Sequence, residues 1–245
     1  MEVNLEIIGC GDAFGSGGNN HTCFYLRTDR LQILIDCGAT SGPALKKHHI
    51  DISSLDYVLV SHLHGDHFGG LPFLLLDSLQ TPRVKPLQIV GPPGIKERTR
   101  QLFDLLYPGS AKNLDEEMFI YTTYTSEQVL KTDCFSLEVF PVIHTEQAMP
   151  HGLKLTLQGK VVSYSGDTSW CDNLIAIAKN ADLFICECTF YNHEGKGHLN
   201  YHTIMQHRPE LDCEMLLLTH LDQEMLDAAD KVEVPCAYDG MKLTI

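Results

Sequence analysis

Three histidines and an aspartate lie within six residues of this chain, as His62, His64, Asp66 and His67. Imidazole nitrogens and carboxylate oxygens are the ligands that zinc and other borderline divalent metals prefer. Gly65, between the two pairs, allows the sharp turn that converging side chains need. The pattern therefore predicts a metal site rather than a solvated histidine-rich loop.

The position of this cluster also favours a functional role. It follows directly on an apolar segment, residues 55–60, that we expect to form a strand. The ends of strands are where α/β folds place their chemistry. The residues after the cluster, 68–72, predict the start of a helix bordered by glycines.

The rest of the chain alternates between segments that predict strands and segments that predict helices. Strands are expected at residues 3–8, 23–27, 31–35, 87–90, 119–123, 136–142, 153–157, 161–165, 183–187, 215–219 and 241–245, and helices at 43–49, 71–79, 95–107, 173–179, 201–207 and 223–229. Strand-rich halves with interspersed helices predict an α/β layered fold. The sequence has no internal repeat and no linker-like run, so we expect one domain over residues 1–245.

The pattern His-x-His-x-Asp-His after an apolar strand resembles the metallo-β-lactamase fold superfamily. Four further segments follow the order of motifs in that superfamily, and the likeness covers nearly the whole chain: Leu34-Ile35-Asp36-Cys37-Gly38, Val142-Ile143-His144, Tyr164-Ser165-Gly166-Asp167-Thr168 and Leu218-Thr219-His220-Leu221. Each segment alone is weak evidence, but five in order, each at an expected strand end, are specific. The resemblance implies a four-layer αββα sandwich that forms a single hydrolase domain.

The resemblance also implies two metal ions. The first would be bound by His62, His64 and His144, the second by Asp66, His67 and His220, and both by Asp167. Three neutral imidazoles would keep the first ion a strong Lewis acid, while the carboxylates limit the net positive charge. Zinc is the expected metal, with manganese and iron as alternatives. A hydroxide shared by the ions, formed from water whose pKa falls to about 7, would attack the substrate.

Two segments resemble the phosphodiesterase branch that includes ribonuclease Z. The segment Cys186-Glu187-Cys188-Thr189-Phe190 resembles the His-Glu-Ala-Thr motif of that branch, with a cysteine in place of the histidine. The segment Gly197-His198-Leu199-Asn200 resembles the His-Ser-Thr motif that follows it. The catalytic candidates are thus Asp66, His198 and Glu187.

We expect His198 to donate a proton to a leaving alkoxide, with Glu187 orienting or charging it. His202 is the competing candidate, at the expected start of a helix where it would only cap or pack.

The spacing between His144 and Asp167 bears on the substrate. Ribonuclease Z carries a long arm between these two motifs that grips transfer RNA. Here only 22 residues separate them, and they predict two strands around residues 158–160. The formal net charge of −14 also opposes binding to phosphate backbones. We therefore expect a small phosphodiester such as a cyclic nucleotide, and not transfer RNA, as the substrate.

Other functions are compatible with the same ligands. A carbonyl hydrolase acting on a thioester, lactone or β-lactam would use the same two metals and would not need His198. A non-hydrolytic accessory protein is disfavoured by the intact ligand set. An oxygen-reducing di-iron protein is disfavoured by His64, since those relatives resemble His-x-Glu-x-Asp-His. A homodimer is implied by the resemblance alone.

The N-terminal segment carries two acids and no basic region typical of a signal peptide. No stretch approaches the ~20 consecutive apolar residues of a membrane span. We therefore expect a cytoplasmic protein without a membrane partner, and a secreted β-lactamase is disfavoured.

The nine cysteines are odd in number and scattered, which predicts reduced, buried thiols rather than disulfides. Cys186 and Cys188 would point to one face of a strand, either as packed thiols or as a metal pair. The glycine-rich segment 9–18 does not lead into a helix, so a dinucleotide fingerprint is disfavoured and a loop near the active site is expected. Asp12, Asn20, His21, Phe73 and the loop 145–152 are candidate pocket residues, although a structural role is favoured for each.

Overall fold

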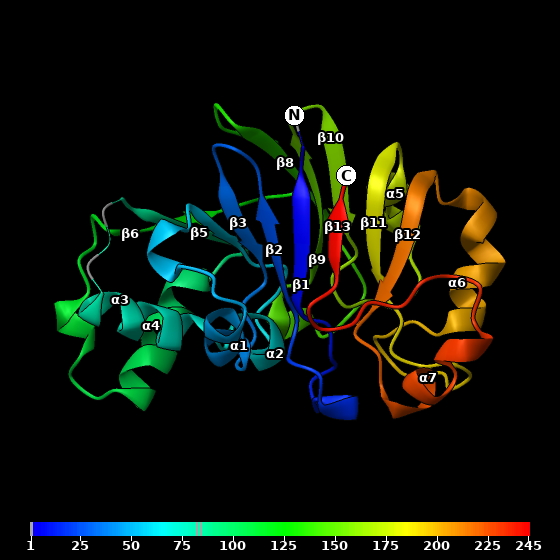
Figure 1. Cartoon of the computed structure of the whole chain (residues 1–245), viewed down its shortest axis with the longest axis horizontal. Helices are drawn as coiled ribbons and strands as arrows, with labels where there is room; N and C mark the ends of the chain where they lie inside the picture. Colours follow the sequence, from blue (N-terminus) through cyan, green and yellow to red (C-terminus); the bar gives the residue numbers. More distant parts are fainter. Residues whose placement is uncertain (1, 82, 84) are drawn as a thin grey trace.

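Two β-sheets pack face to face in the computed structural model, which describes residues 2–81, 83 and 85–245 (Figure 1). Helices cover the outer faces of both sheets, which gives the four-layer αββα sandwich expected from the sequence. In the described part of the chain, none of the helices combines the length and the apolar character needed to cross a bilayer.

The first sheet has seven strands in the order β13-β1-β2-β3-β4-β5-β6. Their bounds are β1 (Asn4–Gly9), β2 (Cys23–Arg27), β3 (Gln32–Ile35), β4 (Tyr57–Leu59), β5 (Leu87–Gly91), β6 (Phe119–Thr123) and β13 (Lys242–Thr244). Strands β3 to β6 run parallel, and β13, β1, β2 and β3 pair antiparallel. The C-terminal strand thus closes the sheet beside the first strand of the chain.

The second sheet has six strands in the order β12-β11-β10-β9-β8-β7. Their bounds are β7 (Leu130–Lys131), β8 (Phe135–Pro141), β9 (His151–Leu157), β10 (Lys160–Tyr164), β11 (Ala181–Glu187) and β12 (Cys213–Thr219). Strands β10, β11 and β12 are parallel, and the other pairs are antiparallel. The edge strand β7 was not predicted, because two residues are too short to show an alternating pattern.

The helices divide between the two outer faces. Those associated with the first sheet are α1 (Ser41–Lys47), α2 (Gly65–Phe68), α3 (Leu71–Gln80) and α4 (Ile95–Leu106), and those associated with the second are α5 (Asn173–Ala178), α6 (Tyr201–His207) and α7 (Gln223–Asp227). On the first sheet, Leu34 and Val58 pack in one cluster with Phe103 of α4. Side chains on the other side of the strands, such as Ile7 and Phe24, fill the core between the sheets. Because successive side chains of a strand point to opposite faces of the sheet, each strand contributes residues to two different cores.

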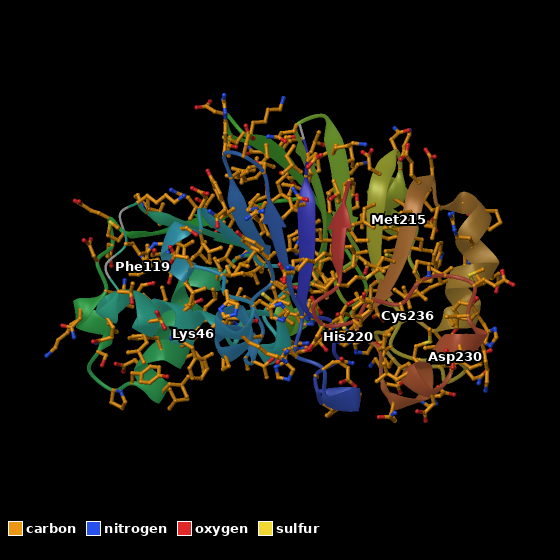
Figure 2. The ribbon with its side chains drawn as sticks, in the orientation of Figure 1. Lys46, Phe119, Met215, His220, Asp230 and Cys236 are labelled. Carbon is orange, nitrogen blue, oxygen red and sulfur yellow. The ribbon has the colours of Figure 1, made fainter. Side chains whose placement is uncertain are left out.

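The parallel strands of both sheets end at one edge of the sandwich, and the connections that leave this edge carry the chemistry. His220, directly after β12, lies at the lower ends of the strands near the middle of the molecule (Figure 2). The elements predicted from the sequence occur at the expected places, with ends shifted by a few residues.

The segment after β4 differs from expectation, because the histidine cluster itself is partly helical. Asp66 and His67 lie within the short helix α2, and α3 begins separately at Leu71. The chain breaks at two glycines between the helices. A Cβ at Gly70 would lie 2.3 Å from the carbonyl oxygen of Gly38, so only glycine permits this close approach.

Candidate metal centre and active site

Seven predicted ligands come together at this edge from both sheets. Each follows a strand end by a few residues or lies in α2 just beyond β4: His62, His64, Asp66, His67, His144, Asp167 and His220. Strand ends hold these side chains in place because the backbone before them is fixed by the sheet ladders. The structure therefore joins residues that are up to 158 positions apart in the chain.

The donor atoms form two groups. In the first, the donor atoms of His62, His64 and His144 lie within 4.8 Å of one another. Nε2 of His144 is 3.1 Å from Nδ1 of His64. A set of three histidines at this spacing matches the first site that the sequence predicted.

The second group contains Asp66, His67, Asp167 and His220, all buried and with donor atoms within 4.8 Å of one another. Oδ2 of Asp167 is 3.3 Å from Nε2 of His67 and 3.3 Å from Nε2 of His220. The same oxygen is 3.7 Å from Nε2 of His62 in the first group. Asp167 thus lies between the two groups, as a bridging ligand would.

Unpartnered polar atoms test whether this pocket fits divalent ions. Among the described residues, Nε2 of His62, Nε2 of His67 and Oδ1 of Asp167 are buried without a hydrogen-bond partner. Such atoms are rare in proteins because desolvation without a partner is costly. Three of them converging in one place, all of metal-ligating type, fit a divalent metal centre.

Burial influences the protonation of the ligands. It lowers the pKa of His62, His64 and His144, which favours the neutral imidazoles that bind metals. Burial opposes ionisation of Asp167, yet the neighbouring His220 and His67 hold the pKa of Asp167 well below its usual range. The three imidazoles of the first group and Asp167 therefore favour their ligand forms. Against the effect of burial, the carboxylates of Asp167 and Asp66 raise the pKa of His67 and His220, so a metal at the second group must displace protons from these imidazoles.

Asp36 orients His67 directly, and it orients His62 through Ser61. Its carboxylate accepts a hydrogen bond from Nδ1 of His67 at 2.7 Å, and it accepts the backbone N–H and the hydroxyl of Ser61, both at 2.7 Å. The Ser61 hydroxyl lies 3.0 Å from Nδ1 of His62. Both imidazoles are thereby turned so that Nε2 faces the centre, as outer partners of metal ligands do.

Thr189 and Gly197 play the same part for two further imidazoles, those of His220 and His144. The Thr189 hydroxyl lies 3.0 Å from Nδ1 of His220, and Nδ1 of His144 donates to the carbonyl oxygen of Gly197 at 2.8 Å. Thr189 also donates to Oε2 of Glu187 at 3.1 Å. The hydroxyl therefore links a metal ligand to the predicted catalytic carboxylate.

His198 and Glu187 form a pair beside the donor groups. Nδ1 of His198 is 2.9 Å from Oε1 of Glu187, and the glutamate is completely buried. Backbone N–H groups of Thr168, Thr189 and Leu199 donate to the same carboxylate at 2.9 to 3.1 Å. Burial opposes the charge on His198, but the bond to Glu187 raises its pKa above the ordinary value.

A cavity of about 400 Å³ opens onto both donor groups. Four histidines line it: His64, His144, His198 and His220. Asp12 and Phe14 from the glycine-rich loop, Phe190, and Asp222 just before α7 complete this part of the lining. His198 lines this cavity, whereas His202 does not and instead bonds Asn192 at 2.9 Å on the surface of α6. The geometry thus separates the two general-acid candidates.

Other candidates have different places. Asp12 lines the cavity, but Asn20 bonds the carboxylate of Asp239 at 2.7 Å and Phe73 lines a separate hollow beside α1. Cys186 and Cys188 are buried, and burial raises the pKa of both thiols, so they pack as core residues.

The contacts of Ser61 and Thr189 were not anticipated from the sequence. For Thr189, the only signal in the sequence was its place in the segment 186–190, two residues after Glu187.

A four-layer αββα sandwich with this histidine and aspartate cluster at its strand ends defines a metallo-hydrolase of the metallo-β-lactamase fold, on the ribonuclease Z-like branch. The family model described as Anti-Pycsar protein Apyc1 matches residues 3–235, and the chain belongs to this family.

Individual relatives agree with this placement. Ribonuclease Z of Ignicoccus hospitalis is 26% identical over 299 residues, covering 99% of this chain and 97% of the relative. Anti-Pycsar protein Apyc1 of Bacillus phage BSP38 is 24% identical over 238 residues, covering 92% of this chain and 91% of the relative. Among solved structures, a diphosphatase from the PhnP family superposes with a TM-score of 0.82 at 15% identity, covering 100% of this chain and 98% of that one, and it shows the shared fold.

Proposed function

We propose that this chain is a dinuclear metal-dependent phosphodiesterase that acts on a small phosphodiester such as a cyclic nucleotide. The observation that carries the proposal is the His198–Glu187 pair, in which His198 lines the same cavity as ligands of both donor groups and Glu187 is buried behind it. Alkoxide leaving groups need a proton, and a charged imidazole beside the reaction site supplies one.

The two donor groups would hold one divalent ion each, with Asp167 shared. Zinc suits this set because three imidazoles in the first group, and two imidazoles with two carboxylates in the second, are nitrogen and oxygen ligands that zinc accepts. When bound, such ions polarise the phosphoryl oxygens and lower the pKa of water, which provides the nucleophile.

His198 would act on the leaving group. Glu187 occupies Nδ1, which leaves Nε2 available to a substrate in the cavity. The raised pKa of His198 favours its protonated form, so Nε2–H donates to the leaving oxygen as the P–O bond breaks. Glu187 would act as a positioning residue that also stabilises the charge, and Asp66 as a ligand that shapes the second metal position.

The cavity and its surroundings favour a small substrate. A volume of about 400 Å³ lies in the range of sites for small molecules, roughly 300–1,000 Å³. Between His144 and Asp167 the chain forms the hairpin β9–β10, whose turn at Gln158 and Gly159 has two positive φ values. This tight turn leaves no arm for gripping transfer RNA, and the net charge of −14 points the same way. Membership of the Apyc1 family supports a cyclic nucleotide.

The test is a substrate screen on protein with its metal content measured by mass spectrometry. We expect about two zinc ions per chain and turnover of bis(p-nitrophenyl) phosphate and of 2′,3′- or 3′,5′-cyclic nucleotides. Asp167→Asn, which removes the shared ligand charge, is the inactive control. Fully metallated protein that cleaves a thioester or lactone but no phosphodiester would show that the proposal is wrong. A homodimer, expected from the family, is tested by light scattering.

A further inference from the structure

Phe14 stands out among the residues that line the cavity. Phe14 is 90% exposed, whereas the metal ligands that line the same cavity are buried or half-buried. Single exposed apolar residues are common and need no explanation. This ring, however, lies at the mouth of the cavity that holds both donor groups and His198.

The loop that carries Phe14 is held in place by one buried carboxylate. Oδ1 of Asp12 accepts the backbone N–H groups of Phe14 at 3.2 Å and of Ser16 at 2.9 Å, and Oδ2 accepts the Ser16 hydroxyl at 2.7 Å. Asp12 is only 3% exposed. The loop is therefore ordered before any ligand arrives, and binding to the ring costs little loop entropy.

The loop also lies beside α7 (Figure 1) and is in contact with it. A Cβ at Gly17 would lie 2.6 Å from Cδ1 of Leu226, so the missing side chain lets the loop approach α7. The glycines here do not cradle a phosphate at a helix start. They allow a rigid loop to present an aromatic ring.

The cavity combines metal-ligating side chains with an apolar part of its lining. Donor atoms of both metal positions lie inside, while Ala13, Phe14 and Phe190 contribute apolar lining. A ligand that matches both parts has an anionic phosphodiester at one end and a flat aromatic group at the other. A nucleotide has this form, and its base can stack on a phenyl ring in water.

We propose that Phe14 is the platform on which the base of a bound nucleotide stacks while its phosphodiester lies over the metal donors. The inference rests on the proposed phosphodiesterase function and names its substrate class as base-bearing nucleotides. Stacking tolerates every base because each has a π-face, so we expect weak discrimination between purines and pyrimidines.

The test compares zinc-loaded wild type and Phe14→Ala on a 3′,5′-cyclic nucleotide and on its base-free analogue, methyl ribofuranoside 3′,5′-cyclic phosphate. We expect Phe14→Ala to lower the ratio of kcat/KM between nucleotide and analogue about tenfold, mainly through KM, as loss of a base–aromatic stack does. Phe14→Tyr should restore the ratio. Phe73→Ala, which removes another exposed phenyl ring beside a different hollow, is the matched control and should leave it unchanged.

A binding measurement separates stacking from chemistry. The Kd of a nucleoside 5′-monophosphate should rise about tenfold in Phe14→Ala, while that of ribose 5-phosphate should not. Equal losses for both ligands would overturn the inference and make Phe14 a structural residue of the loop. Wild-type turnover of bis(p-nitrophenyl) phosphate without any preference for nucleotides over the base-free analogue would also overturn it and leave the phosphodiesterase proposal standing. Absence of all phosphodiesterase activity would refute both.

Discussion

Oε1 of Glu187 lies 2.9 Å from Nδ1 of His198, and the glutamate is buried at the end of β11 while the histidine lines the cavity. Three backbone N–H groups fix the carboxylate, so the direction of the bond is set by the fold and not by the flexible side chain. A histidine held in this way presents its other nitrogen in one direction. The predictions for catalysis follow from this geometry.

His198→Ala should slow the reaction most where the leaving group needs a proton. We expect kcat for a cyclic nucleotide to fall about 10²- to 10⁴-fold, the usual size of a general-acid contribution. For bis(p-nitrophenyl) phosphate the fall should be far smaller, since p-nitrophenolate leaves without protonation. Steady-state kinetics on both substrates checks this. His202→Ala on the surface of α6 is the control and should behave as wild type.

Glu187→Gln should change the pH dependence of kcat. The carboxylate raises the pKa of His198, and the general acid works only when protonated, so kcat falls as pH rises through that pKa. Removing the negative charge lowers the pKa, and the basic limb of the profile should move to lower pH. A uniform loss of kcat with an unmoved basic limb would mean that Glu187 has a purely structural role.

The sequence was sufficient to predict the elements and the metal cluster, because both leave short-range patterns. The residue types and spacing of residues 62–67 predict a metal site without any further information. Apolar alternation and runs likewise predicted most strands and helices within a few residues of their observed ends. These signals lie within short segments of the chain, and each segment can be interpreted without knowing its tertiary contacts.

What the sequence could not predict is which distant groups meet. The bond between Asp36 and His67 joins residues 31 positions apart, and nothing in either neighbourhood specifies the partner. The pairing of β13 with β1 also depends on tertiary packing. The sequence predicted that the loop 9–18 lies near the active site, but it did not single out Phe14 as a residue that lines the cavity. His144, Asp167 and His220 were found through the order of family motifs, since each alone is an ordinary residue.

Asp36→Asn should weaken metal binding without disturbing the backbone. Asp36 has a φ of 57°, a left-handed conformation that asparagine tolerates well. The amide cannot hold Nδ1–H of His67 as the carboxylate does, so we expect zinc affinity to fall about 10- to 100-fold. Competition with a chromophoric chelator measures this.

Asp56→Asn provides the comparison, because Asp56 bonds Gln32 and Lys85 away from the metal site. Its zinc affinity should equal that of wild type. An unchanged affinity in Asp36→Asn would contradict the orienting role of the carboxylate.

Two buried tyrosines of the core should respond to loss of the hydroxyl with opposite signs. The hydroxyl of Tyr164 is buried without a partner among the described residues, while its ring packs edge-on to Phe24 at 5.3 Å. Tyr164→Phe keeps that packing and removes an unsatisfied group, so the free energy of unfolding should rise by about 1 kcal/mol. The hydroxyl of Tyr124 donates to the carbonyl oxygens of Val60 at 2.8 Å and Ser61 at 2.9 Å.

Tyr124→Phe leaves these carbonyl oxygens without that donor, so it should lower the free energy of unfolding by about 1–3 kcal/mol. Urea unfolding of the zinc-loaded variants, followed by circular dichroism, measures both changes on one scale. The two variants lose the same atom from equally buried rings, so the difference in sign isolates the hydrogen bond itself. If Tyr164→Phe destabilises the protein as much as Tyr124→Phe, the Tyr164 hydroxyl has a buried partner such as an ordered water, and the argument from an unsatisfied group is wrong.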